Sequence, residues 1–354
     1  MKKTNSQKLI EYVNTLPDVC TPFFLETANA MATSTKCAYA KELILFFEHL
    51  VYVNPDFCDY DSIKRFTVDD LKKIKSEDIS RYITLYMGDQ KRENGGHAVR
   101  TCARKRAALS SFFNYLVNNR KIEYNPVLAS AKIKIEQSDD VIHLDFEEQN
   151  TFIDAVEYGD KLTKRQKTYH ERYALRDKAL ILLLLDTGMR VSELAGLDIK
   201  DIDFDRCSAF VLRKGGKMQH LYFSDEVRDD LIEYIDSRKI KEEEKMDSPL
   251  FVTLKGDRLS IRAIEVLVKK YATTALPGKD KITPHKMRSS FAMGFYEETK
   301  DILALQRKLG HKNLSATNIY AKATDKRMQE TRSIVSAGRE RIKQMPADSE
   351  HSYQ

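Results

Sequence analysis

A histidine and a tyrosine, His311 and Tyr320, lie nine residues apart in the helix-like segment LGHKNLSATNIYA. On one unbroken α-helix, nine residues rotate the chain by roughly 900° and advance it by about 13 Å, so the two side chains would point in opposite directions. Gly310 suits a left-handed helix end, and Asn313 or Ser315 can cap a new helix after it. The sequence therefore permits a break that brings an imidazole and a phenol to one site.

Tyr320 alone is a weak nucleophile, because an unperturbed phenol has a pKa of about 10. It becomes effective where a base removes its proton or where its target is strongly polarised. A buried tyrosine at helical spacing is more often part of a core, so the catalytic interpretation depends on the residues around it.

Arg190 and Glu193 lie in the segment DTGMRVSELAGL, which joins an apolar helix to a second helix through Thr187 and Gly188. Residues three apart share one face of a helix, so we expect these two side chains to meet on the second helix. Taken alone, the pair is equally well interpreted as a common surface ion pair.

His285 and Arg288 belong to the segment ITPHKMRSSFA, in which Thr283 can cap a helix and Pro284 fits its first position. Both side chains then lie in the first turns, beside the positive end of the helix. An arginine, an imidazole and unpaired N–H groups can hold a phosphate. An ordinary helix start with surface residues would show the same pattern.

Residues 207–224 predict a β-hairpin, because two β-rich segments flank Lys214-Gly215-Gly216-Lys217. Lys214 at such a basic tip can reach a bound phosphate diester and donate a proton to it. A plain surface turn is the alternative.

The remaining pattern predicts two mostly helical domains. Helices are expected at 34–53, 75–87 and 97–120. The charged stretch 161–178 is interpreted as a region that connects helices. The predicted boundaries are a helical domain at 1–134, an extended linker at 135–144, a second domain at 145–345 and a disordered tail at 346–354.

Positive charge is concentrated in residues 91–134, where ten Lys and Arg face two Glu, a local excess of eight positive charges; the whole chain carries +6. Such a concentration favours a polyanionic partner. A solvated helix face would have the same composition. Our candidate DNA contacts are the basic residues of the 97–120 helix: Arg100, Arg104, Lys105 and Arg106.

Other features exclude several classes of protein. The longest apolar run, residues 179–185, is too short to span a bilayer, and the first residues lack the apolar core of a signal peptide. Five scattered cysteines without a CxxC pair fit a reducing cytoplasm better than disulfides or zinc. The nucleotide-binding pattern GxxxxGK[ST] and the zinc pattern HExxH are both absent from the sequence. We expect a cytoplasmic protein that does not bind a membrane.

The order Arg, Lys, His-x-x-Arg, His and Tyr resembles that of the tyrosine recombinases, or phage-integrase family. TGMRVSELAGL resembles the family's first-arginine motif, LRKGGK its lysine hairpin, TPHKMR its His-x-x-Arg motif and LGHKNLSATNIY its final motif. The resemblance covers nearly the whole chain. FVLRKGGK and the chain length are most similar to the single-chain Xer recombinases that resolve chromosome dimers. One departure is Ser289, where the family often has histidine; we expect little effect, because the position lies outside the catalytic set.

This resemblance implies a mainly α fold, with a helical core-binding domain at 1–134 that binds DNA and an α-rich catalytic domain that carries a small β-hairpin. Tyr320 would attack the scissile phosphate and form a 3′-phosphotyrosyl bond. Lys214 would protonate the departing 5′ oxygen, and His285 would assist proton movement at the nucleophile.

The resemblance also implies how the phosphate is held. Arg190 and Arg288 would clamp its non-bridging oxygens, His311 would hydrogen-bond one of them, and Glu193 would orient its neighbours. Cations placed in advance stabilise the charge of the transition state. The set is cationic and lacks a carboxylate cluster for Mg²⁺, so we expect no metal and no other cofactor.

Strand exchange by such an enzyme implies a homotetramer on two DNA duplexes. Residues 325–345 are our candidate segment for docking on a neighbouring subunit. An accessory protein is a possible further partner. A phage or conjugative-element integrase or transposase is an open alternative to the Xer role. A type IB topoisomerase and a non-catalytic DNA-binding regulator are more distant alternatives.

Overall fold

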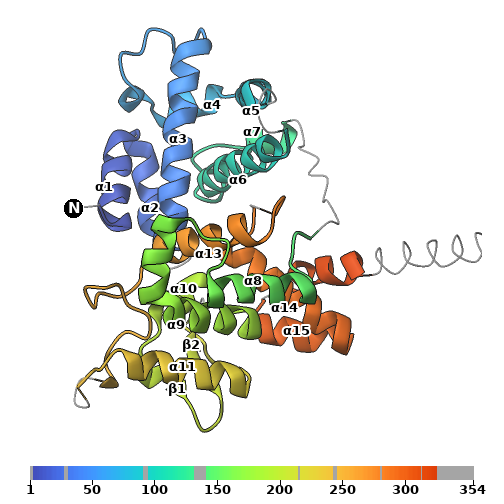
Figure 1. The fold of residues 1–354 in the computed structure, drawn as a ribbon. Helices are drawn as coiled ribbons and strands as arrows, with labels where there is room; N and C mark the ends of the chain where they lie inside the picture. Colours follow the sequence, from blue (N-terminus) through green and yellow to red (C-terminus); the bar gives the residue numbers. More distant parts are fainter. Residues whose placement is uncertain are drawn as a thin grey trace, which may run out of the picture. The chain divides into compact units, whose positions relative to one another are not determined.

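The computed structural model describes residues 3–27, 31–90, 95–130, 141–213, 216–241, 245–279, 281–311 and 313–324, without the side chains of 85–90, 95–98 and 100. The chain divides into two compact units, Met1–Gln137 and Ser138–Gln354. Both are built mainly from helices, and a small sheet belongs to the second (Figure 1). The predicted mainly α fold with a small β-hairpin is thus confirmed.

Helices form the first unit. They are α1 Asn5–Thr15, α2 Thr21–Glu26, α3 Thr33–Val53, α4 Val68–Lys73, α5 Ser76–Gln90, α6 Gly95–Asn118 and α7 Pro126–Ala129, with short 3₁₀ turns at Asp18–Cys20 and Ile63–Arg65. The helices predicted at 34–53, 75–87 and 97–120 correspond to α3, α5 and α6.

Aromatic side chains fill the core of the first unit. Phe46 and Phe47 of α3 meet Phe112 and Phe113 of α6 with their rings edge to face, and all four are fully buried. This geometry adds a favourable quadrupole interaction to the burial of apolar area. The two helices are therefore fixed against each other.

Helices also form most of the second unit. They are α8 Phe146–Tyr158, α9 Lys164–Thr187, α10 Val191–Gly196, α11 Asp225–Ser237, α13 Ile261–Ala275, α14 Pro284–Thr299 and α15 Ile302–Leu309; a 3₁₀ turn spans Ile199–Asp201, and residues 315–324 are helical. The charged stretch 161–178, expected to connect helices, instead enters α9 at Lys164, because Thr163 caps the helix there.

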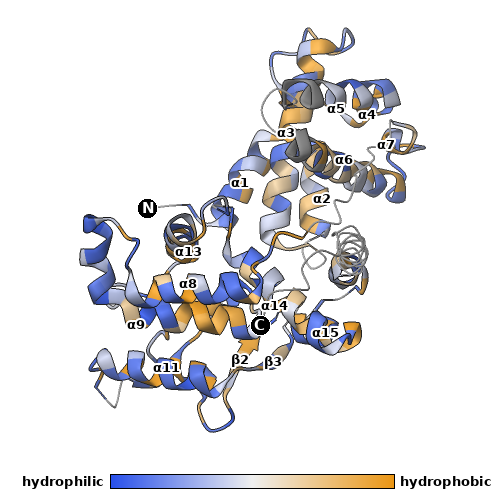
Figure 2. Cartoon of the chain, turned by 45° about the vertical axis from the view of Figure 1, so that its right-hand side comes forward, coloured by the Kyte–Doolittle hydropathy of each residue, from blue (hydrophilic) through white to orange (hydrophobic). Residues whose placement is uncertain are grey.

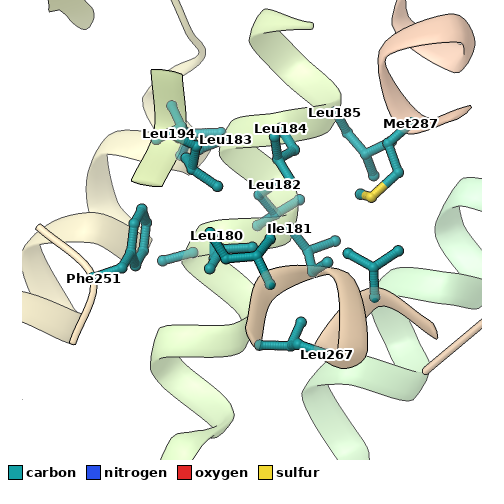
Figure 3. Packing of buried hydrophobic residues seen from close by; sticks show 14 of the residues in the cluster. Leu180, Ile181, Leu182, Leu183, Leu184, Leu185, Leu194, Phe251, Leu267 and Met287 are labelled. Carbon is teal, nitrogen blue, oxygen red and sulfur yellow. The ribbon is translucent and has the colours of Figure 1, made fainter. Parts of the chain in front are cut away.

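The apolar half of α9 is the centre of this unit. Residues 179–185 are all buried, as expected of a helix that is apolar on every side. Figure 2 shows this apolar segment between α8 and α11, which both pack on it together with α14. Close by, Leu194, Phe251 and Met287 complete the packing (Figure 3).

The sheet has three antiparallel strands in the order β1 Ile202–Asp203, β2 Ser208–Leu212 and β3 Met218–Tyr222. Strands β2 and β3 form the predicted hairpin, with Leu212 opposite Met218. Strand β1 was not predicted, because two residues carry no detectable period. The hairpin's tip residues 214 and 215 lie outside the described residues.

Glycines end the two helices that lead to the motifs. Gly188 follows α9 and Gly310 follows α15, both with a left-handed backbone (φ 59° and 61°). The chain is helical again from residue 315, so the predicted break between His311 and Tyr320 is present.

Residues 141–144 have no regular secondary structure, and the rest of the predicted linker and the tail lie outside the described residues. Among the helices that are described, none combines the length and the apolar character that crossing a membrane requires.

Candidate active site

Segments of the second unit that are distant in the sequence bring basic and aromatic side chains to one place. The buried guanidinium of Arg288 interacts electrostatically with Arg190, Arg213 and the phenol of Tyr320. The imidazole of His311 interacts electrostatically with Arg288, with the other two arginines and with His285. Of the predicted catalytic residues, only Lys214 lies outside the described residues.

Arg288 is held at the start of α14, whose N-cap Thr283 and N1 residue Pro284 are as predicted. Its Nη1 donates to the Gly188 carbonyl at 2.6 Å, and its Nη2 donates to the Leu309 carbonyl at 2.5 Å. These carbonyls end α9 and α15, so one side chain joins three helices.

Burial and the neighbouring guanidinium groups lower the pKa of Arg288 to about 10. The side chain nevertheless stays charged at neutral pH. It is 3% exposed, so its charge acts in a poorly solvated place, where it interacts more strongly than in water.

Arg190 lies one residue before α10, as its N-cap, and not on the helix face where the spacing predicted it. Its Nη1 donates to Oε1 of Glu193 at 2.8 Å, while its backbone N–H donates to Oε2 at 2.8 Å. The Arg190 side chain is 35% exposed, whereas that of Glu193 is 5% exposed. The carboxylate therefore fixes a guanidinium that faces solvent.

His311 is held through both ring nitrogens. Its Nε2 lies 3.2 Å from Nη2 of Arg288, and its Nδ1 lies 3.0 Å from Oγ1 of Thr317. Arginine can only donate, so Nε2 is the acceptor and Nδ1 carries the proton. Burial, followed by the charges of Arg288 and Arg190, lowers the pKa of His311 to about 4. The ring is neutral at physiological pH.

Tyr320 is 4% exposed. Burial raises the pKa of its phenol, while a hydrogen bond with the Ser289 side chain and the charge of Arg288 act in the opposite direction. The phenol is therefore protonated at neutral pH. The expectation that position 289 lies outside the catalytic set missed this contact, because residues 289 and 320 belong to separate motifs.

His285 lies at the surface of the site. Partial desolvation, together with the charges of Lys286, Arg288 and Arg190, lowers its pKa. Above this lowered pKa the imidazole is neutral, which is the form that can accept a proton.

Arg213 is a further residue of this site that the sequence reasoning missed. It is 6% exposed and donates to the carbonyls of Lys308 and Leu309 and to the Glu193 carboxylate. A signal did exist, since Ala209 and Val211 are buried and strand alternation places Arg213 on the same side.

The predicted DNA contacts of α6 differ in accessibility. The Arg104 side chain is 61% exposed. Arg106 is partly buried, and its Nη2 donates to the Val127 carbonyl at 2.8 Å. The side chain of Arg100 lies outside the described residues.

The structure contradicts the prediction that Lys105 contacts DNA. It is 2% exposed, and its Nζ contacts a Glu42 carboxylate oxygen at 2.5 Å and the Tyr82 hydroxyl at 3.2 Å. A buried ammonium paired in this way has no access to nucleic acid, and helix periodicity alone does not reveal the distant Glu42.

The arrangement is suited to an oxyanion. It combines guanidinium groups, neutral imidazoles and a buried phenol, which can together bind a phosphate group, neutralise its charge and attack it. Among the described residues there is no cluster of three or more His, Cys, Asp or Glu that could hold a metal ion.

Comparisons with known proteins agree with this chemistry. The model of the phage integrase family matches residues 143–327, more than half of the chain. The tyrosine recombinase XerC of Caldanaerobacter subterraneus subsp. tengcongensis is 31% identical over 317 residues, 87% of this chain and 83% of the relative. The tyrosine recombinase XerS of Streptococcus thermophilus is 28% identical over 341 residues, 89% and 94% of the two chains.

The fold has a counterpart among solved structures. A post-cleavage complex of the site-specific recombinase XerH with a palindromic difH substrate has a TM-score of 0.68 and 22% identity, and the match covers 94% of this chain and 89% of that one. The matched family, the full-length relatives and the shared fold lead to one conclusion. The chain belongs to the phage integrase family, and it is a tyrosine-type site-specific DNA recombinase of the Xer type.

Proposed function

We propose that this protein resolves chromosome dimers by cutting and rejoining DNA at a specific site, with Tyr320 as the nucleophile. The observation that carries the assignment is the position of the Tyr320 phenol, buried within the field of Arg288 and in contact with Ser289. A buried phenol beside fixed cations is costly for a core but suited to attack on a phosphate.

In the proposed reaction, the phenolic oxygen of Tyr320 bonds to phosphorus while the bond from phosphorus to the 5′ oxygen breaks. The phenolic proton passes to neutral His285, and the 5′ oxygen receives a proton from Lys214. Arg190 and Arg288 stabilise the negative charge on the non-bridging oxygens, and His311 donates a hydrogen bond to one of them once the bound anion favours its imidazolium form. The phosphotyrosyl ester conserves the energy of the broken bond, so rejoining needs no ATP.

Glu193 has a supporting role in this proposal. Its buried carboxylate joins Arg190 at 2.8 Å and Arg213 at 3.4 Å. It thereby reduces the repulsion between two guanidinium groups and fixes the direction of the one that faces solvent.

For DNA binding, the first unit would act as the core-binding domain and the second as the catalytic domain, with Arg104 as the accessible contact among the described basic residues of α6. Recombination would require a homotetramer on two duplexes, with residues 325–345 as the docking segment, which lies outside the described residues. An accessory protein is compatible with this scheme. Action on a chromosome would place the protein at the nucleoid of a bacterial cytoplasm.

The integrase of a mobile element is the second candidate, because it uses the same chemistry. Similarity to XerC and XerS over 87% and 89% of the chain favours the chromosomal role. Mapping the covalently trapped site in genomic DNA separates the two. A site near the replication terminus supports dimer resolution, whereas sites at the ends of an element support mobility.

Tyr320→Phe tests the chemistry, with the exposed Tyr222→Phe as a matched control. The wild type and the control should form a covalent protein–DNA band in denaturing gels, and Tyr320→Phe should bind the same DNA without forming it. A covalent band from Tyr320→Phe would disprove the nucleophile assignment. If the wild type relaxes plasmids without recombining them, a topoisomerase is favoured instead. If the wild type binds DNA without cleaving it, a non-catalytic regulator is favoured.

A further inference from the structure

Arg213 directly follows strand β2 and continues the inward-facing side of that strand. Its Nη2 donates to the Lys308 carbonyl at 2.8 Å and its Nη1 to the Leu309 carbonyl at 3.0 Å, while Nη1 also lies 3.4 Å from Glu193. The negative end of a helix dipole favours a cation at this place. The side chain therefore joins the hairpin to the end of α15 and to the Arg190–Glu193 pair.

The other strand of the hairpin is tied to the same helix end. Nε2 of Gln219 donates to the Arg307 carbonyl at 3.1 Å. Three successive carbonyls, those of residues 307, 308 and 309, thus accept hydrogen bonds from side chains on both arms of the hairpin. The part of the hairpin next to its turn is therefore docked through both arms.

The backbone of Arg213 is also held, by hydrogen bonds with residues 216 and 217. Its N–H donates to the Lys217 carbonyl at 2.7 Å, and its carbonyl accepts from the Gly216 N–H at 3.1 Å. Arg213, the residue directly before Lys214 in the sequence, is therefore held through its backbone as well as through its side chain.

This anchor is not what stability alone would select. A guanidinium that is 6% exposed carries a desolvation cost, and its buried Nε has no partner among the described residues. The fold also makes room for it, since a Cβ atom on Gly310 would lie 3.3 Å from Nε and Cζ of Arg213. A buried charge that is retained at such a cost and placed beside a catalytic motif indicates a role in the reaction.

We propose that Arg213 is the positioning residue of the general acid: its anchor to the end of α15 and to Glu193 is what allows Lys214 to protonate the departing 5′ oxygen. This inference rests on the proposed function, in which Lys214 protonates that oxygen. Misplacement of a catalytic group by about 1 Å can cost roughly 100-fold in rate.

The test compares two DNA substrates that differ in one atom of the scissile bond. One has the natural 5′ oxygen, and the other has sulfur in its place, a 5′-bridging phosphorothiolate. When Tyr320 attacks the second, the phosphorus–sulfur bond breaks and the sulfur leaves as a thiolate. A thiol has a pKa of about 8.5, so this leaving group does not need a proton from Lys214.

We expect Arg213→Met to cleave the natural substrate roughly 10²–10³-fold more slowly than the wild type and the sulfur substrate within about tenfold of it. Lys214→Ala should show the same pattern. Lys217→Met, a change of the exposed lysine in the same turn, should keep the wild-type ratio of the two rates. Arg213→Lys, which has one donor group in place of a fork, should fall between wild type and Arg213→Met.

The ratio of the two rates within one preparation does not depend on the fraction of molecules that fold. If Arg213→Met and Arg213→Lys slow both substrates equally, Arg213 does not act through Lys214 and the inference is wrong. If Lys214→Ala also slows both equally, the proposed role of Lys214 fails as well. A wild type that cleaves neither substrate would refute the proposed function and the inference with it.

Discussion

Arg213 and Arg288 donate hydrogen bonds to the same backbone oxygen, the carbonyl of Leu309, at 3.0 Å and 2.5 Å. Arg213 directly follows strand β2, Arg288 lies in α14, and both side chains are almost fully buried. The end of α15, immediately before Gly310 and His311, thus holds two cations that would otherwise repel each other. The phosphate site is therefore built around main-chain oxygens.

Arg288→Lys should abolish most of the cleavage while DNA binding persists. A lysine is a point charge without the planar fork that contacts the Gly188 and Leu309 carbonyls at once. We expect the single-turnover cleavage rate to fall roughly 10²–10³-fold, the range for losing one donor to a developing oxyanion. Arg307→Lys, at an exposed position of α15, is the matched control. Equal rates for Arg288→Lys and the control would contradict the proposed clamp.

His311 should titrate far below an ordinary histidine. Its pKa of about 4 results from burial and from the nearby arginines. NMR titration of the free protein should therefore show a neutral ring between pH 6 and 8. Arg288→Met should raise this pKa, because the largest charge that opposes protonation is removed. A bound phosphate should raise it too, since an anion favours the imidazolium. An unshifted pKa near 6.5 in the free protein would contradict the buried geometry.

The cleavage rate should keep its neutral-pH value at least down to pH 6.5. The pKa of His285 is lowered, so the neutral base is the dominant form above the ordinary value of 6.5 and is lost only at a pH below it. His285→Ala should lower the rate by roughly 10²-fold and remove this acid limb. The measurement is a pH profile of single-turnover cleavage. A wild-type profile that already falls above pH 6.5 would exclude His285 as the base.

Ser289→Ala should slow the attack step although no charge is removed. The Ser289 side chain hydrogen-bonds the phenol and favours its ionised form, so its loss should raise the pKa of Tyr320 further. We expect a several-fold lower cleavage rate at pH 7 and a smaller defect at high pH. The control is Ser290→Ala, whose hydroxyl contacts the N–H of Leu144 instead. A defect that is independent of pH would point to a purely structural role.

Lys105→Met and Arg104→Ala should separate stability from DNA binding. The first leaves the buried Glu42 carboxylate without its closest partner and should cost about 3–5 kcal/mol, seen as a lower thermal midpoint of the full chain. The second removes a mostly exposed charge whose contact with Glu42 is longer, at 3.4 Å, so it should lower the midpoint much less than Lys105→Met. It should weaken DNA binding and reduce the slope of log affinity against log salt by about one. The reverse pattern would restore Lys105 as a DNA contact.

Local features were predictable because they depend on residues a few positions apart. Thr283 and Pro284 start α14, Gly310 ends α15, and the alternation along β2 defines the hairpin. The charged beginning of α9 was missed, because polar residues hide helical periodicity; only its capping box at Thr163 marks the start.

The sequence by itself determined the family, the order of the motifs and the types of the residues in them, since each motif is local. The tertiary structure alone decided which of these side chains meet. Arg288 binds a carbonyl 100 residues away, and Lys105 turns inward to a carboxylate 63 residues away. Such pairs are fixed by the packing of whole helices and by the cost of burying an unpaired charge, which no spacing along the chain encodes.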